Sequence, residues 1–393
     1  MESRKNEYDA IVIGGGIVGT SIAYHLVEAG ADTLLIDRGD VGQATSAGAG
    51  IVAPLISERF PGRAAGFALR AGAYVGALAA ALARESAEPT GYARCGLLLV
   101  AASEDEGEKF SRALPVILER AGGDGSCRSV QASEAVRLFP ALGPVYGALH
   151  YRDAARVDGR LLTRALRAAA ERRGLTASGE NVVELIRERD RIAGVRTERG
   201  TLRAGAVALA AGAWSGAFAK TLGVDLRVEP QRGQILHLDL GEPHNSATGG
   251  TGDWPIVVGF RDHYIVPWPG GRIVAGATRE TGSGFAAQVT AAGVREVLDE
   301  ALRVAPGLAN AELAEIRVGL RPLSLDGLPI LGPVPGLESL HLATGHGPSG
   351  LTLGPYSGKL IADCILGRER GDGAELEPFS LMRFDGASAP APQ

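Results

Sequence analysis

A glycine-rich turn between an apolar segment and a helical segment constrains the fold of this chain more than any other feature. Residues 10–13 (AIVI) are apolar and β-prone, and residues 14–19 (GGGIVG) follow at once. Residues 20–29 have the apolar spacing of a helix, residues 33–36 (TLLI) have the pattern of a second strand, and Asp37 follows them. The order strand, glycine turn, helix, strand and acid predicts a nucleotide-binding unit at the start of an α/β domain.

Each part of this unit has a physical role beside a dinucleotide. Gly14 permits the tight turn, Gly16 lets the backbone approach a pyrophosphate, and Gly19 allows helix and strand to pack closely. Asp37, 18 residues after Gly19, can accept hydrogen bonds from both ribose hydroxyls and disfavours a 2′-phosphate, which argues against NADP. NAD and FAD share this pattern, and an ordinary turn between strand and helix is the structural alternative.

A second loop of small residues follows the unit at 42–50 (GQATSAGAG). Its length and its two hydroxyls suit a segment that passes beside a long cofactor, whereas a flexible linker is the alternative. Glycine is frequent in the whole chain, with 56 in 393 residues against a usual share of ~7%. We therefore expect many tight turns or close backbone approaches.

Charge and cysteine content narrow the class of protein. The net charge is −5 without a block of basic residues, so the pattern of a nucleic-acid binder is missing. The three cysteines are far apart, which suits neither a zinc site nor a disulfide framework, and we expect no metal.

The longest uncharged run, residues 204–219, is 16 residues long, short of the ~20 that a membrane span needs. The amino-terminal residues form no apolar leader, so we expect a cytoplasmic protein without a membrane span. Whether it forms a homo-oligomer stays open.

Four segments, spread over nearly the whole chain, carry a family pattern. The first is IVIGGGIVGTSIAYHL with LIDR and ATSAGAG, and the second runs from Asn181 (NVV) to Ser215. The third, HYIVPWPGGRIVAGATRE, starts at His263. The fourth joins GLRPLSLDGLPILGP, from Gly319, with GHGPSGLTLGPYSGKLIADCI, from Gly345. In this order and spacing they resemble the D-amino-acid oxidase superfamily of flavoproteins, most closely its glycine oxidases, sarcosine oxidases and bacterial D-amino-acid dehydrogenases.

The resemblance implies an α/β fold with a second domain of α+β type. A Rossmann-type FAD-binding domain would be formed by residues 1–88, 144–224 and 319–371. A discontinuous substrate domain, built mainly on an antiparallel sheet, would be formed by residues 89–143 and 225–318. The resemblance leaves residues 372–393 as a flexible tail.

Local sequence patterns are compatible with this layout. Residues 94–102 have the pattern of a strand, and residues 158–173 have the spacing of a long amphipathic helix. A further helical stretch spans residues 351–366. Its positive amino-terminal end would face the flavin edge on which negative charge appears during reduction.

The resemblance also implies non-covalent FAD and a set of cofactor-binding residues. Ser46 and its neighbours would contact the pyrophosphate, and Val183 would meet the adenine through its backbone. Ala211 and Gly212 would let the backbone pass close to the cofactor, and residues 345–352 would wrap the flavin ring. The full set is Gly14, Gly16, Gly19, Asp37, Arg38, Thr45, Ser46, Val183, Ala211, Gly212, Gly345, Gly347, Gly350, Leu351 and Thr352.

Two residues are candidates for binding the substrate. Arg321 lies in an otherwise apolar stretch, where a guanidinium needs a partner, and a substrate carboxylate would supply one through a bidentate pair. In the family an arginine of this GLRP segment has that role, and Tyr264 matches a tyrosine that donates its hydroxyl to the same carboxylate. A structural ion pair for Arg321 and a strand position for Tyr264 are the alternatives. His263 and His346 could also line the site.

Three departures from the family pattern affect the reaction. Pro348 stands where glycine oxidases have a second arginine, which puts carboxylate binding by two arginines in doubt. The GLRP region has no cysteine to tether a flavin, so FAD should be non-covalent. Residues 272–276 (RIVAG) have no lysine of the kind that activates oxygen in sarcosine oxidases. The electron acceptor is therefore open, either oxygen or a quinone-like compound.

The expected reaction is oxidation of an amino acid or an N-alkyl amino acid to an imino acid, with hydride transfer to flavin N5. Positioning would do most of the work, because such a reaction demands little acid–base chemistry of the protein. Two alternatives stay open. One is oxidation of a 2-hydroxy acid or a polyol phosphate on the same scaffold, and the other is a flavin-bearing electron-transfer subunit of a larger oxidase complex.

Overall fold

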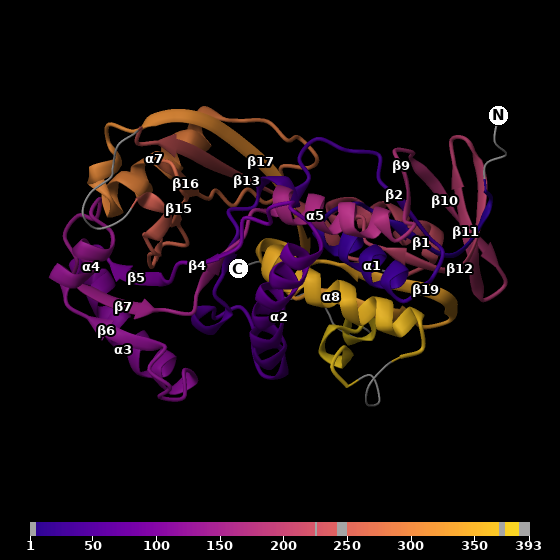
Figure 1. Ribbon diagram of the computed structural model, residues 1–393, viewed down its shortest axis with the longest axis horizontal. Helices are drawn as coiled ribbons and strands as arrows, with labels where there is room; N and C mark the ends of the chain where they lie inside the picture. Colours follow the sequence, from indigo (N-terminus) through magenta and orange to yellow (C-terminus); the bar gives the residue numbers. More distant parts are fainter. Residues whose placement is uncertain (1–4, 225, 242–249, 369–373, 385–393) are drawn as a thin grey trace.

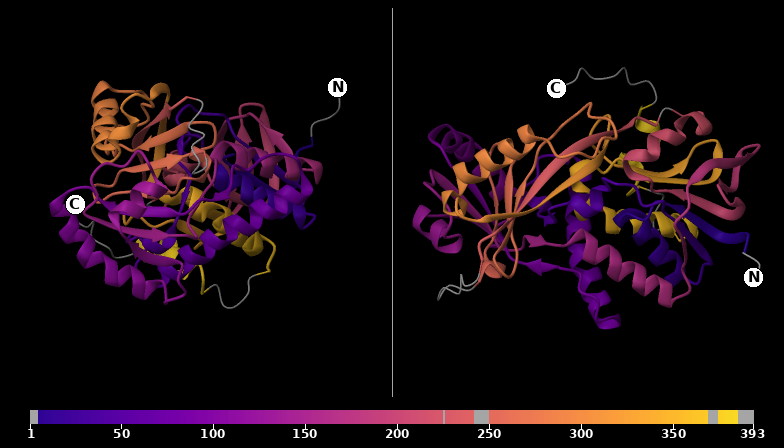
Figure 2. Two further views of the ribbon diagram at one scale, coloured as in Figure 1. Left: turned by 60° about the vertical axis from the view of Figure 1, so that its left-hand side comes forward. Right: turned by 90° about the horizontal axis from the view of Figure 1, so that it is seen from above.

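Two large sheets lie at opposite ends of an elongated molecule (Figures 1 and 2). The computed structural model describes residues 5–224, 226–241, 250–368 and 374–384. Each large sheet has eight strands, and a third sheet of three short strands belongs to neither. This third sheet consists of β3 (Ile51–Val52), β8 (Ala155–Arg156) and β4 (Ala93–Arg94).

The first large sheet is the centre of the dinucleotide-type domain. Its middle strands β19, β12, β1, β2 and β9 run parallel, whereas β10 and β18 pair antiparallel at its margins. In spatial order the strands are β10 (Val182–Glu188), β11 (Arg191–Thr197), β19 (Leu337–Thr344), β12 (Gly200–Leu209), β1 (Glu7–Ile13), β2 (Thr33–Ile36) and β9 (Thr176–Ser178), with β18 (Ile330–Val334) on β19.

Both faces of this sheet are buried, which explains the continuous apolar run of β1. Ala10 and Val12 face a core shared with four helices, whereas Ile11 and Ile13 face a second core on the opposite side. Strands that are covered on both faces read as unbroken hydrophobic runs. The helices on the first face are α1 (Ile17–Glu28), α2 (Arg63–Glu85), α5 (Gly159–Arg172) and α8 (Gly350–Ile365), and the short α6 (Ala219–Leu222) packs on the other face.

The helices expected from the sequence are present. Asp158 caps α5 by accepting hydrogen bonds from the N–H groups of Arg160 and Leu161 at 2.9 and 3.1 Å. Helix α8 begins one residue before the expected start, and α1 begins at Ile17, three residues before it. Gly19 therefore lies inside α1, where the absence of a side chain permits close packing.

The second large sheet is mainly antiparallel, as expected for the substrate domain. Among the described strands of this sheet, only the β14–β5 pair is parallel. In spatial order the strands are β17 (Glu312–Ser324), β13 (Val228–Asp239), β16 (Arg272–Gly276), β15 (Tyr264–Pro267), β14 (Ile256–Val258), β5 (Leu97–Ala101), β7 (Gly147–Tyr151) and β6 (Cys127–Val130). Helices α3 (Glu104–Arg120), α4 (Ala132–Leu138) and α7 (Ala291–Val304) pack against it.

The strand pairings shift two expected domain boundaries. Strand β7 pairs with β5 and β6, so the substrate domain extends beyond residue 144 to Tyr151. Strand β17 pairs with β13 up to Ser324, which moves the return to the first domain beyond residue 319. The expected strand at 94–102 is divided into β4 and β5, because Gly96 takes a positive φ of 74° between them.

The expectation of a flexible tail at 372–393 is wrong for residues 374–384. The ring of Phe379 is fully buried and lies 4.5 Å from that of Phe67 of α2, centroid to centroid. The Arg383 guanidinium donates to Asp326 at 2.8 Å. Residues 372–373 and 385–393 lie outside the described residues. Residues 374–384 carry apolar side chains without periodic spacing, and the burial of Phe379 and Leu381 depends on partners far away in the sequence.

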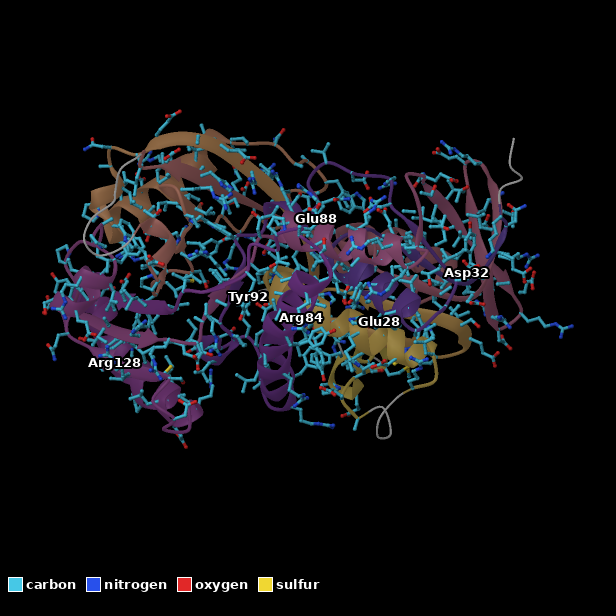
Figure 3. The ribbon with its side chains drawn as sticks, viewed as in Figure 1. Glu28, Asp32, Arg84, Glu88, Tyr92 and Arg128 are labelled. Atoms are coloured by element: carbon cyan, nitrogen blue, oxygen red, sulfur yellow. The ribbon has the colours of Figure 1, made fainter. Side chains whose placement is uncertain are left out.

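One described helix, α2, has the length and apolar composition that could cross a membrane. Its buried residues, Phe67 and Leu82 among them, belong instead to the core that α1, α5 and α8 share. Acidic and basic side chains are mixed over the face of the molecule seen in Figure 3. Arg84 and Glu88, at and just beyond the carboxyl end of α2, are labelled there. The absence of a membrane span stays a prediction from the sequence.

Replacing Phe379 with alanine tests the packing of the carboxyl-terminal segment. We expect Phe379→Ala to lower the free energy of unfolding by about 3–5 kcal/mol, because it leaves a cavity beside Phe67. Chemical denaturation would measure the loss, with Met382→Ala as the control because that side chain is 48% exposed. A loss for Phe379→Ala no larger than for the control would contradict the packing.

Candidate functional site

A cavity of about 1100 Å³ lies between the two domains. It exceeds the ~300–1,000 Å³ of ordinary small-molecule pockets, and both domains contribute to its lining. The glycine turn, the loop at 42–51, the β12–α6 connection and the start of α8 line one part. Side chains from the second sheet, including Tyr264 and Arg321, line the other.

Most of the residues expected to form the site line this cavity. They come from positions 14 to 352 of the chain, and the fold brings them together. The lining set is Gly14, Gly16, Asp37, Arg38, Thr45, Val183, Ala211, Gly212, Gly347, Gly350, Leu351, Thr352, Tyr264 and Arg321.

Three expected cofactor residues do not line the cavity. A Cβ on Gly19 would lie 1.9 Å from the Gly14 carbonyl oxygen, so Gly19 serves the close packing of α1 on the sheet. The Ser46 hydroxyl donates to the Gln43 carbonyl at 2.9 Å instead of facing the cavity. Gly345 takes a positive φ of 73° in the turn that precedes the lining segment. The neighbouring Thr45, which belongs to the same expected set, does line the cavity.

Asp37 is held in place by backbone donors at one end of the cavity. Its carboxylate accepts from the N–H groups of Gly15 at 2.5 Å and Gly39 at 2.6 Å, and from the Gln43 side chain at 3.0 Å. Arg38 donates to Asn181 at 3.2 Å, and both line the same part of the cavity. The acid is thus fixed at the end of β2, where a ribose would lie.

Arg321 projects from β17 at the other end of the cavity. Its guanidinium lies against the backbone of Gly233, where a Cβ would come within 2.4 Å of Nη2. Nη1 donates to the Thr278 carbonyl at 3.0 Å. In the part of the chain that the structure describes, no carboxylate forms an ion pair with Arg321. The alternative that Arg321 forms a structural ion pair with an Asp or Glu is therefore not supported by the described residues.

Tyr264 lies beside Arg321. It faces Gly276 across the β15–β16 pair, and a Cβ on Gly276 would come within 2.8 Å of the Tyr264 hydroxyl. Burial raises the pKa of Tyr264, and the charges of Arg321 and Arg279 oppose that shift. The hydroxyl keeps its proton at neutral pH and can donate it to an anion next to Arg321.

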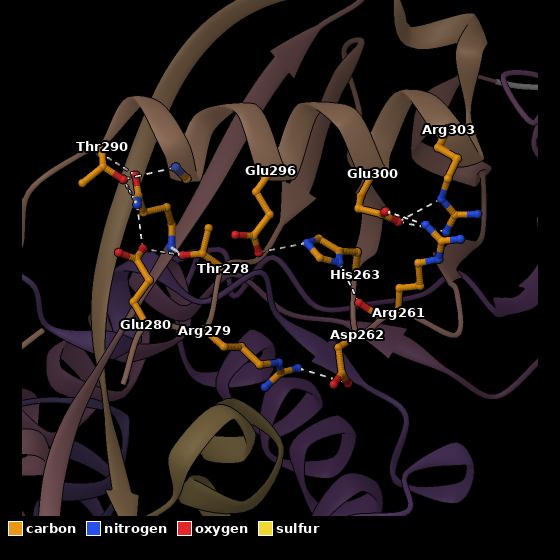
Figure 4. A network of polar contacts seen from close by, with 12 residues as sticks. Arg261, Asp262, His263, Thr278, Arg279, Glu280, Thr290, Glu296, Glu300 and Arg303 are labelled. Atoms are coloured by element: carbon orange, nitrogen blue, oxygen red, sulfur yellow. Dashed lines mark hydrogen bonds and ion pairs between the residues drawn. The ribbon is translucent and has the colours of Figure 1, made fainter. Parts of the chain in front are cut away.

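Two further arginines, Arg59 and Arg279, line the end of the cavity at which Arg321 lies, which we call the substrate end. The sequence analysis did not predict them as site residues. Arg59 and Arg279 both contact Asp262 Oδ1, at 3.2 and 3.4 Å, and Figure 4 shows Arg279 reaching toward Asp262. Arg279 lies in the family-like segment GATRE (residues 276–280), which is the one signal that could have pointed to it. Arg59 lies in a loop without a motif, in a chain where arginine is abundant.

The two candidate histidines have different surroundings. His346 lines the cavity, is buried, and contacts the Ser357 hydroxyl at 3.1 Å. Burial lowers the pKa of His346 to about 4, so the ring is neutral at pH 7. His263 does not line this cavity, because it turns toward the Arg261 carbonyl at 2.7 Å and Glu296 at 3.5 Å (Figure 4).

Comparison with known proteins decides the family. Residues 9–364 match the family of FAD-dependent oxidoreductases called DAO. The chain belongs to this family. It is 40% identical over 370 residues to an uncharacterized oxidoreductase of Bacillus subtilis (strain 168), YurR, covering 94% of this chain and 97% of that protein. It is 33% identical over 366 residues to glycine oxidase of Bacillus licheniformis, covering 92% and 94%. The crystal structure of iminodiacetate oxidase (IdaA) from Chelativorans sp. BNC1 matches with a TM-score of 0.87 at 37% identity, covering 94% of this chain and 98% of that one.

The cavity of this FAD-dependent oxidoreductase fits a flavin dinucleotide. Helices α1 and α8 both start at its wall, and neither has an acidic residue in its first turn. Their free N–H groups favour negative charge, such as a pyrophosphate or a reduced flavin. Gly212 lines the cavity with a positive φ of 53°, and a Cβ there would meet no atom within 4 Å, so a side chain would point into open space. None of the three cysteines lines the cavity.

Replacing Gly233 tests the seat of Arg321 in this oxidoreductase. We expect Gly233→Ala to push the guanidinium aside and to raise the Kd of (methylthio)acetate, a carboxylate without an amine, by about 10- to 100-fold. Perturbation of the visible absorption of bound FAD would measure the Kd. Gly250→Ala is the control, because no atom lies within 4 Å of its Cβ position. An equal Kd for both variants would argue against this seat.

Replacing His346 tests its burial as a neutral ring. Between pH 6.5 and about 4 the unfolded chain binds a proton that the folded His346 does not, so stability falls as the pH falls. We expect His346→Gln to reduce the slope of the free energy of unfolding against pH by up to about 1.4 kcal/mol per pH unit in this range. Above this range the slope should be the same in both proteins. Denaturant titrations across this range would show it. His237, whose pKa burial also lowers to about 4, keeps its own contribution in both proteins. Identical slopes would mean that His346 titrates normally.

Proposed function

We propose that this FAD-dependent oxidoreductase oxidises an amino acid or an N-alkyl amino acid of the glycine type to an imino acid. The observation that supports this most is the pair formed by Arg321 and Tyr264. The Arg321 guanidinium is partly buried and forms no ion pair with a carboxylate of the described residues, and a protonated phenol lies beside it; together they would make a site for a substrate carboxylate.

The relatives support the same substrate class. A glycine oxidase is 33% identical to this chain, and an iminodiacetate oxidase is 37% identical. Glycine is a primary amine, and iminodiacetate is a secondary amine with an N-substituent. Both relatives thus act on an amine whose α-carbon carries a carboxylate, which is the arrangement that Arg321 and Tyr264 would hold.

The residues of the chain contribute mainly by positioning. Arg321 binds the carboxylate and Tyr264 donates a hydrogen bond to it, which fixes the α-carbon in the cavity. Bound FAD supplies the acceptor for the hydride from that carbon. The amine loses a proton, a carbon–nitrogen double bond forms, and water then hydrolyses the imino acid. No described residue has to act as a strong base if the amine binds unprotonated, and neutral His346 brings no charge to the site.

The electron acceptor belongs to the proposal as oxygen or a quinone-like compound. No lysine is among the cavity-lining residues of the described chain, and β16 has none. Oxygen activation by a lysine, as in sarcosine oxidases, therefore has no support from these residues. Reoxidation of the reduced protein in air, compared with a quinone, distinguishes an oxidase from a dehydrogenase.

Anaerobic mixing of the yellow protein with candidate substrates tests the proposal. We expect glycine-type amino acids or N-alkyl amino acids to bleach the flavin and to release ammonia or an amine. If only 2-hydroxy acids or polyol phosphates bleach the flavin, the proposed substrate class is wrong and one of these compounds is the substrate. Bound FAD that none of these compounds reduces would instead favour an electron-transfer subunit of a larger complex.

Removal of Arg321 tests its part in the proposal. We expect Arg321→Ala to raise KM for carboxylate substrates by about 10- to 100-fold, because a charged hydrogen-bond partner is lost, while the FAD content stays unchanged. Arg321→Lys should be intermediate, since it restores the charge without the planar fork. An equal loss of FAD content and of substrate affinity would contradict the role of Arg321 in binding the substrate carboxylate.

A further inference from the structure

The substrate end of the cavity carries more positive charge than one substrate carboxylate would balance. Arg59, Arg279 and Arg321 line it, and Asp262 is the carboxylate that pairs with two of them. These four groups sum to +2. Glu58 also lines the cavity and is exposed, as Arg59 is; it is left out of this sum because, in the described part of the chain, it forms no ion pair with these arginines.

Asp262 is a weak counter-ion for two guanidinium groups. Both arginines contact the same oxygen, Oδ1, at 3.2 and 3.4 Å, and the Asp262 side chain is 68% exposed. Arg279 Nε is buried and has no hydrogen-bond partner among the described residues. The Arg59 and Arg279 side chains are 45% and 29% exposed, so parts of both remain available to a ligand.

The charges of these arginines act on one another. Burial lowers the pKa of Arg59, and the neighbouring charge of Arg279 lowers it further. Burial also lowers the pKa of Arg321, and the charges of Arg279 and Arg59 add to that effect. The three guanidinium groups therefore repel one another across a shared space, and an anion with two negative groups would relieve the repulsion more than an anion with one.

The two guanidinium groups come from different segments of the chain. Arg59 follows the turn Pro54–Ile56, whose Leu55 packs in the core of the second sheet, and Arg279 follows β16 of that sheet. Asp262 lies in the turn between β14 and β15 with a positive φ of 61°, a conformation that Asp tolerates better than most residues. The turn thus holds one oxygen between the arginines and leaves their other donors toward the cavity.

We propose that Arg59 and Arg279 form a second carboxylate site and that the substrate is a dicarboxylic amine. One carboxylate binds Arg321 and Tyr264, and the other binds Arg59 and Arg279, which balances the charge of +2. The inference rests on the proposed function, since it names the substrate class of the same site.

Two unreactive probes test the second site in the FAD-loaded protein. Thiodiacetate has two carboxylates, (methylthio)acetate has one, and neither has an amine to be oxidised. We expect thiodiacetate to bind at least about 10-fold more tightly, with Kd measured by perturbation of the flavin absorption and by calorimetry. Equal affinities for the two probes would overturn the proposal without any variant.

Variants assign the preference to the two arginines. We expect Arg59→Gln and Arg279→Gln each to raise the Kd of thiodiacetate by about 10- to 100-fold. The Kd of (methylthio)acetate should rise by less than about 3-fold. Arg295→Gln on α7 is the matched control, because it removes the same charge from a side chain that is 82% exposed and does not line the cavity. Equal weakening of both probes by the arginine variants would contradict a separate second site.

A substrate comparison separates failure of this inference from failure of the proposed function. Glycine, N-methylglycine and N-(carboxymethyl)glycine would be mixed with the protein anaerobically. We expect the dicarboxylic amine to bleach the flavin at the lowest concentration. Bleaching by amino acids without preference for two carboxylates would keep the function and overturn the inference. Preferential binding of thiodiacetate without bleaching by any amine would keep the second site and overturn the function.

Discussion

The close contact of backbone around Gly14 determines how the rest of the structure is arranged. A Cβ on Gly14 would lie 2.3 Å from the Ala210 carbonyl oxygen, and one on Gly19 would lie 1.9 Å from the Gly14 carbonyl oxygen. Only glycine at these positions lets α1 start directly on top of β1 and beside β12. Helix α8 then crosses α1 closely, since a Cβ on Gly358 would lie 2.6 Å from Ser21 Cβ. The amino-terminal ends of both helices are thereby brought to one cavity wall.

The two ends of the cavity recognise their ligands by different physical means. At the dinucleotide end glycines line the wall together with the carboxylate of Asp37, which three donors hold in place. At the substrate end the wall is side chain, with guanidinium groups partly removed from water and one protonated phenol. Backbone can lie close to a large cofactor without entropy cost from side chains, whereas guanidinium groups supply charge and direction to a small anion.

The features that local sequence encodes could be predicted, and the features that depend on distant partners could not. The glycine turn, Asp37 and the helices at 158–173 and 351–366 follow from spacing within a few residues. The fold class followed from the family resemblance. The assignment of β7 to the second sheet, the extension of β17 to Ser324 and the packing of Phe379 depend on partners far away in the sequence. Arg59 was missed for the same reason, because its significance arises only where the fold places it beside Arg279.

Strand β17 carries a consequence for how the two ligands influence each other. The Leu320 N–H donates to the Gly42 carbonyl at 2.8 Å, and a Cβ on Gly319 would come within 2.8 Å of Ala47. The strand that holds Arg321 is thus joined to the loop that lines the cofactor end. If FAD orders this loop, the contact would carry the effect to Arg321. A ligand on Arg321 would then strengthen FAD binding by the same free energy with which FAD strengthens the binding of that ligand, because coupling between two sites is reciprocal.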